Sequence, residues 1–255
     1  MRYPWIVMGC LISGLATGVQ ADDQTFVANS RYVLHEYRDA VVDLSATAKI
    51  DIGQGKIQEQ RGHCPGVVID ANGLVVTALN RLDPTPLVVS SIKHQNPNLN
   101  PSVTVTDIKI IWADGAETPG RIVLKDPDLD LAFVLPEFPE GKANPVTKPI
   151  PLTNDSSAQI FDRIISLGRL EERYQRENVL VEGRIAAIIE KPRRLYYVQS
   201  TVPGAPIFTE RGSFLGLGVT RFSKQEGPDS LRVFILPVQD IRELAGQAYN
   251  DPNVN

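Results

Sequence analysis

Residues 66–82, GVVIDANGLVVTALNRL, decide how this 255-residue chain is interpreted. Two runs of branched apolar residues flank an Asn72-Gly73 dipeptide, which is typical of the tight turn in a β-hairpin. The segment therefore predicts two antiparallel strands, residues 66–70 and 74–78, and the second strand runs directly into Asn80.

Two later segments also contain apolar strands next to turn residues. Residues 121–135, RIVLKDPDLDLAFVL, contain two apolar strands around an Asp-Pro turn, and Asp130 precedes the second strand. Residues 197–218, YVQSTVPGAPIFTERGSFLGLG, place a Pro-Gly-Ala-Pro turn before further apolar strands. Many short strands separated by Gly, Pro and Asn favour an all-β barrel or sandwich.

In this order, the three segments resemble trypsin-like serine proteases of the HtrA/Deg type, over about residues 41–245. In that family they carry the catalytic histidine, the aspartate that orients it and the nucleophilic serine. The resemblance places Asn80, Asp130 and Pro203 at these positions when the third segment is aligned backward from Pro206. Alignment forward from Gln199 implies a shortened loop instead, and neither alignment supplies a serine.

The resemblance implies an all-β fold of two six-stranded antiparallel barrels, chymotrypsin/trypsin-like, with short N- and C-terminal helices. The catalytic positions, however, are degenerate. An asparagine amide cannot replace the histidine base that the aspartate would orient, and a proline has no N–H for an oxyanion hole. We therefore expect a catalytically inactive protease homologue without cofactor or metal, whose remaining cleft binds a protein or peptide against a strand edge. The expected contact residues are Ser200, Thr201, Gly204 and Ala205.

Two alternatives stay open. The first is an active serine endopeptidase in which Ser200 or Ser213 acts with an unrecognised base, and the second is a structural or assembly β protein without a site. His63-Cys64 also invites a Cys/His nucleophile or a metal site, but adjacent residues of a strand point to opposite faces. A structural cysteine or a free thiol is therefore favoured.

Residues 1–21 predict a signal peptide, because an apolar run follows Arg2 and Val19-Gln20-Ala21 is a small-x-small cleavage site. We expect a secreted or periplasmic protein cleaved after Ala21. The predicted organisation is a lead-in helix and first barrel in residues 22–136, a linker in 137–151, and a second barrel with a closing helix in 152–255. In the family a PDZ domain commonly follows, but only seven residues follow Ala248, so we expect none here.

Further elements are expected along the sequence. A lead-in helix is expected near residues 25–41. Residues 83–102, rich in Pro and Asn, are an insertion with a short strand expected at 87–92. They are the best candidate among the loops for partner contact, and a neutral surface insertion is the favoured alternative. A long strand is expected over 178–189. A helix over 237–249 should bury one apolar face, made of Val238, Ile241, Leu244, Ala245 and Ala248.

Composition limits the classes of partner. The chain is 42% apolar and 7% aromatic, which is ordinary globular usage. A formal charge of −4 and a pI of about 5.5 argue against nucleic acid and anionic membranes as partners, because both are bound through basic patches. No run after residue 21 reaches the roughly 18 apolar residues that a membrane helix needs. The sequence does not fix the oligomeric state.

Overall fold

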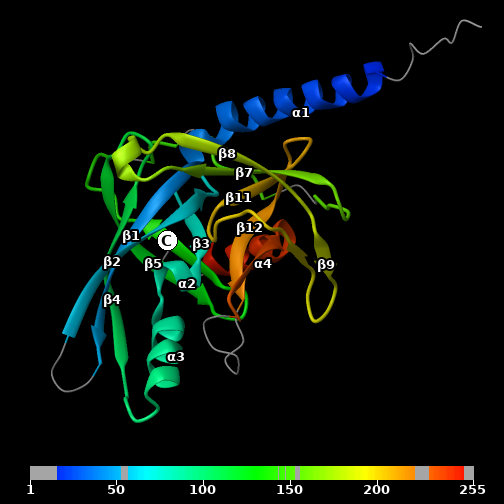
Figure 1. The fold of residues 1–255 in the computed structure, drawn as a ribbon. Helices are drawn as coiled ribbons and strands as arrows, with labels where there is room; N and C mark the ends of the chain where they lie inside the picture. The colour runs from blue at the N-terminus through cyan, green and yellow to red at the C-terminus, as the bar shows by residue number, and fades with distance from the viewer. Residues whose placement is uncertain are drawn as a thin grey trace, which may run out of the picture.

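A computed structural model describes residues 16–52, 57–142, 144–146, 148–152, 156–221 and 230–249, and gives the backbone alone for 16–21. Most of the predicted signal peptide, residues 1–15, lies outside these ranges. Two β units follow one another along the chain, with helix α1 (Ala16–Tyr37) at one end and α3 (Thr85–Gln95) projecting from the other (Figure 1). Within the described residues, no helix is long and apolar enough to span a membrane.

The first unit is a closed antiparallel barrel of six strands, as predicted. Its longest pairing joins the N-terminal strand to the strand after it. Residues 57–63 of this second strand are exposed and mostly polar, and they pair with residues 45–51 of the first. This pairing makes the second strand much longer than the apolar segment 66–70 indicated. In spatial order the barrel consists of β1 (Val41–Asp51), β2 (Ile57–Val68), β3 (Val75–Ala78), β6 (Leu131–Pro136), β5 (Glu117–Asp126) and β4 (Ser102–Ile111).

The insertion after β3 forms helices α2 (Leu79–Leu82) and α3, so the strand predicted for residues 87–92 is wrong. Asp83 Oδ1 accepts hydrogen bonds from the backbone N–H and the hydroxyl of Thr85, which orders the start of α3. Pro86 sits in the first turn, where its missing N–H costs no helical hydrogen bond. The apolar residues of the segment are half-buried and α3 contacts β4.

The second unit is a seven-stranded antiparallel sheet curved into a half-barrel. The strand expected over 178–189 is interrupted at Ile185-Ala186, and its two halves form opposite edges of the sheet. In spatial order the strands are β8 (Asn178–Arg184), β7 (Arg163–Arg169), β11 (Pro206–Thr209), β12 (Phe214–Arg221), β13 (Arg232–Pro237), β10 (Leu195–Tyr197) and β9 (Ala187–Ile189).

One hydrophobic core runs through both units. It joins barrel residues such as Leu44 and Phe133 to Phe208 and Leu236 of the second sheet. Helix α4 (Val238–Tyr249) closes this core with the predicted face, since the five predicted residues are all buried. The second unit adds a smaller cluster of its own around Tyr196 and Ile207.

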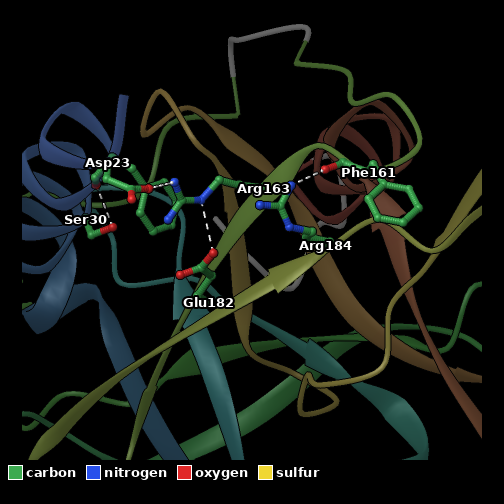
Figure 2. A network of polar contacts seen from close by, with 7 residues as sticks. Asp23, Ser30, Phe161, Arg163, Glu182 and Arg184 are labelled. Carbon is green, nitrogen blue, oxygen red and sulfur yellow. Dashed lines mark hydrogen bonds and ion pairs between the residues drawn. The ribbon is translucent and has the colours of Figure 1, made fainter. Parts of the chain in front are cut away.

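Helix α1 is fastened to the second unit by Arg163 of β7. Figure 2 shows this guanidinium between Asp23 of α1 and Glu182 of β8, at 2.7 and 3.0 Å. It also lies 3.6 Å from the ring centroid of Phe26, whose side chain is buried. The same helix buries Val33, so α1 docks through apolar contact and a cation.

Candidate functional site

Asn80 and Asp130 are brought together by the pairing of β3 with β6. Ala78 is opposite Leu131 in this ladder, and the Leu79 N–H donates to the Asp130 carbonyl at 3.0 Å. Asp130 has a φ of 58°, in the left-handed region that Asn and Asp tolerate better than most residues. This turn directs its carboxyl group toward Asn80 and β12.

The Asp130 carboxyl group is completely buried and accepts three hydrogen bonds. Oδ1 accepts from the Asn80 backbone N–H at 2.6 Å, and Oδ2 accepts from the N–H and hydroxyl of Thr220 at 2.6 and 2.7 Å. The Asn80 side-chain amide completes the network by donating to the Thr220 hydroxyl at 3.0 Å. Burial raises the pKa of Asp130, while the donors from Asn80 and Thr220 and the charge of Arg221 oppose that rise. All three histidines lie in the described part of the molecule, and none hydrogen-bonds to Asp130.

Pro203 lies in a short loop that packs directly onto the sheets. The Gly204 N–H donates to the Gly218 carbonyl at 2.7 Å, and the Gly218 N–H donates to the Ala205 carbonyl at 3.0 Å. Gly204 has a φ of +88°, and a Cβ there would lie 2.3 Å from the Pro65 carbonyl oxygen. The loop therefore requires glycine and lies against β2 without intervening space.

The four predicted contact residues are not equally available. Gly204 and Ala205 are buried, whereas Ser200 is exposed and Thr201 is half-buried, with a hydroxyl oxygen that has no hydrogen-bond partner among the described residues. Ser200 lines a cavity of about 610 Å³ with Gln199 and Phe161.

Ser213, the other candidate nucleophile, lines a different cavity of about 400 Å³ beside Arg163. Within the described residues, neither this cavity nor the one beside Ser200 has a histidine in its wall.

Cys64 and His63 are adjacent in β2, and both contribute to the wall of one cavity. His63 is exposed, while Cys64 is buried with its sulfur 3.6 Å from the Thr77 hydroxyl. Burial raises the pKa of the Cys64 thiol to about 12, which disfavours the thiolate that a nucleophile or metal ligand would need. The part of the sequence that is described holds no group of three or more metal-ligating side chains.

Sequence reasoning missed a cavity of about 580 Å³ between the two β units. The first unit contributes Asp43, His63 and Arg81 to its wall, and the second contributes the end of β7 and the turn before β8, with Arg169 and Arg176. Val202, next to Pro203, closes one side. These residues come from separate segments, and no motif connects them in the sequence.

The fold and the sequence agree with a known family. The trypsin-like peptidase domain matches residues 64–217, which is more than half of the sequence. Among 377 solved structures that match is an HtrA-type protease, AlgW, in a serine-to-alanine variant with a tripeptide. The match has a TM-score of 0.55 and 15% identity, and covers 88% of the present protein and 64% of that protease. No curated protein sequence matches. This protein therefore belongs to the trypsin-like peptidase domain family.

Proposed function

We propose that this protein is an exported, catalytically inactive member of the family that binds an extended peptide or protein segment between its two β units. The observation that carries the proposal is the closed network of Asn80, Asp130 and Thr220. A triad aspartate orients the histidine ring and stabilises its protonated form. Here both oxygens of the Asp130 carboxyl group instead accept hydrogen bonds from amide and hydroxyl donors.

The loop around Pro203 supports the same proposal. The position aligned with the nucleophile has neither a hydroxyl nor a backbone N–H, and the Gly204 N–H that follows already donates to Gly218. A tetrahedral oxyanion needs preorganised donors that are free to point at it. Both groups that would carry acyl transfer are therefore missing from this loop.

The cavity between the β units is the preferred binding position, in place of the predicted Gly204 and Ala205. It has room for side chains of a ligand, and its walls come from two different β units. Ligand sites in proteins are commonly found in such clefts between structural units. Export follows from the signal-peptide pattern of residues 1–21.

Inactivity is tested by labelling the purified protein with a fluorophosphonate, followed by intact-mass detection and a parallel digest of fluorescent casein. We expect no adduct and no cleavage from a folded sample. An adduct that Ser200→Ala or Ser213→Ala abolishes, together with casein cleavage, would identify the nucleophile and overturn the proposal.

Binding is tested by selecting peptides from a displayed random library on the immobilised protein. Leu170 lines the cavity and is partly exposed, so Leu170→Trp should fill the space and remove the binding of selected peptides. Tyr174→Trp is the matched control, because Tyr174 lies in the same turn outside the cavity wall. Peptides that bind both variants equally would place binding elsewhere.

A further inference from the structure

We propose that the cavity between the β units is a carboxylate-binding site, and that the bound segment inserts an acidic group between Arg81 and Arg169. This inference rests on the proposed function and names the chemistry of the ligand. The two arginines belong to opposite β units, since Arg81 lies in α2 and Arg169 ends β7. A carboxylate held by both would therefore bridge the two units.

Arg169 is the fixed half of this site. Its three guanidinium nitrogens donate to the carbonyl oxygens of Val41 at 2.7 Å, Arg176 at 3.2 Å and Arg38 at 2.6 Å. Carbonyl oxygens satisfy these N–H groups but bring no negative charge. Burial lowers the pKa of Arg169, and this cost of holding a buried cation is what a bound anion would offset.

Two donors of Arg169 remain for a ligand. A guanidinium has five N–H groups in a rigid plane, and three of them are used by the carbonyls. The remaining pair belongs to the two terminal nitrogens. Arginine binds carboxylate through such paired donors, which gives geometric selectivity as well as affinity.

The acids in the cavity wall are already engaged by other arginines. Asp43 pairs with Arg176 at 2.6 Å, and both side chains are 15% exposed. Glu171 pairs with Arg173 at 2.8 Å, and Glu172 lies 3.4 Å from Arg176. Four arginines therefore face three acids in the wall. Among the described residues Arg81 and Arg169 make no ion pair with a carboxylate, although the charges of Asp43 and Asp39 oppose the lowering of the Arg169 pKa by burial.

Arg81 is the adjustable half of the site. It is exposed and makes no hydrogen bond or ion pair with another described residue. It follows Asn80 directly, so a ligand held by Arg81 would lie beside the position that the family uses for its histidine. His63 lines the same cavity and adds a second donor on this side.

A peptide offers a carboxylate from two sources, the side chain of Asp or Glu and the free carboxyl terminus. The probes are three fluorescein-labelled peptides of alternating Val and Ser. One carries a central Glu and an amidated end, one has Gln in place of Glu, and one has that Gln with a free carboxyl terminus. We expect at least one carboxylate peptide to bind about tenfold or more tightly than the neutral Gln amide, in anisotropy titrations at low salt.

Arg81→Gln should remove that preference, and Arg211→Gln is the control of equal charge change. Arg211 is exposed in the turn between β11 and β12 and lies outside the cavity wall. Titration with N-acetylglutamate α-amide, followed through the Nε–H resonances of arginine, tests the pocket without a peptide. A shift absent from the N-acetylglutamine amide titration and lost in Arg81→Gln would support the site.

The outcomes separate the two proposals. Equal binding of all three peptides, unaffected by Arg81→Gln, would overturn the carboxylate site and leave peptide binding intact. An arginine shift with N-acetylglutamate amide, without binding of any peptide, would support the carboxylate site and count against peptide binding. If no arginine resonance shifts and no peptide is preferred for its carboxylate, this inference is overturned.

Discussion

Asp130 links distant parts of the fold through hydrogen bonds that involve no histidine among the described residues. Its carboxylate joins the start of α2 to β12 through Asn80 and Thr220, which are 50 and 90 residues away in sequence. Three donors to one buried carboxylate make removal costly, because charge-assisted hydrogen bonds are roughly twice as strong as neutral ones. Structural anchoring is therefore sufficient reason for an aspartate here.

Restoring the histidine alone should not restore activity. Asn80→His keeps the backbone N–H that Asp130 accepts, so an imidazole could be accommodated next to this carboxylate. Pro203, at the position aligned with the nucleophile, supplies neither a hydroxyl nor a backbone N–H, and the Gly204 N–H donates to Gly218, whereas acyl transfer needs both a nucleophile and free oxyanion donors. We expect casein to remain intact and no fluorophosphonate adduct to form. Cleavage by the single variant would contradict the assignment.

Cys64 should make the protein less stable at alkaline pH. Its folded pKa of about 12 exceeds the ordinary 9.0, so above about pH 9 the unfolded protein releases a proton that the native protein retains. The free energy of unfolding should fall by about 2 kcal/mol between about pH 8.5 and about pH 10.5 from this thiol. Cys64→Ala should show a correspondingly smaller fall in urea denaturation. Equal slopes for both proteins would show that the thiol is not protected by burial.

At the residue scale, local motifs point to Asn80, Asp130 and Pro203, because each follows or precedes a recognisable strand. The structure places the first two in one hydrogen-bond network, and Pro203 takes no part in the hydrogen bonds that form it. Thr220 and Arg169 carry no local signal, since their roles depend on segments far away in the sequence. The availability of Gly204 and Ala205 was overestimated because loop composition does not reveal how closely a loop packs.

Among the elements, the loop of residues 200–205 is closely constrained by its neighbours. Gly204→Ala should lower the free energy of unfolding by about 3 kcal/mol or more, since it adds a clash with the Pro65 carbonyl to the strain of a positive φ. Gly115→Ala is the matched control, because Gly115 has a φ of +83° with nothing within 4 Å of an added Cβ. It should cost only about 1–2 kcal/mol. If both variants lost similar amounts of stability in urea denaturation, the loop would be shifting to make room for the added Cβ.

Docking of α1 should depend on Arg163. The Arg163 side chain is 13% exposed and lies over Phe26 and between two carboxylates. Arg163→Ala removes this cation and should lower the free energy of unfolding by about 2 kcal/mol. Hydrogen exchange in α1 should accelerate at the same time. Arg173→Ala provides the comparison, since that side chain is 67% exposed in a similar ion pair and ring contact. Its effect should stay below about 0.5 kcal/mol, and equal effects would show that Arg163 does not fasten the helix.

Elements with a clear apolar period could be predicted from sequence, whereas elements set by tertiary context could not. The buried face of α4 follows helical spacing and is confirmed residue by residue. The half of β2 over residues 57–63 is polar and exists because β1 offers a pairing edge. The apolar run of residues 87–92 suits either a strand or a helix, and the start signals at Asp83 and Pro86 were decisive.

For the whole molecule, the two β units are coupled by more than their shared core. The turn before β8 reaches β1 through Arg176 and Asp43, and Arg169 at the end of β7 donates to Val41. The walls of the cavity are therefore cross-linked at the position where a ligand would enter. These contacts fix the two sides of the cavity relative to one another.

Asp43→Asn should reveal how much the ion pair between Asp43 and Arg176 contributes to the stability of the protein. It removes the closer of the two carboxylates beside the mostly buried Arg176 guanidinium and leaves only the exposed Glu172 at 3.4 Å, so the free energy of unfolding should fall by about 2 kcal/mol. Adding Arg176→Met should recover part of the loss, because a buried ion pair replaced entirely by apolar groups is often nearly neutral. Asp39→Asn is the control, since the pair of Asp39 with Arg38 is exposed and 3.8 Å long, and its loss should stay below about 0.5 kcal/mol. Urea denaturation of the wild type, Asp43→Asn, Arg176→Met and the double variant measures the coupling between Asp43 and Arg176. If Asp43→Asn and Asp39→Asn were equally mild, the shared core alone would hold the units together, and the cavity would owe its shape to packing rather than to charge.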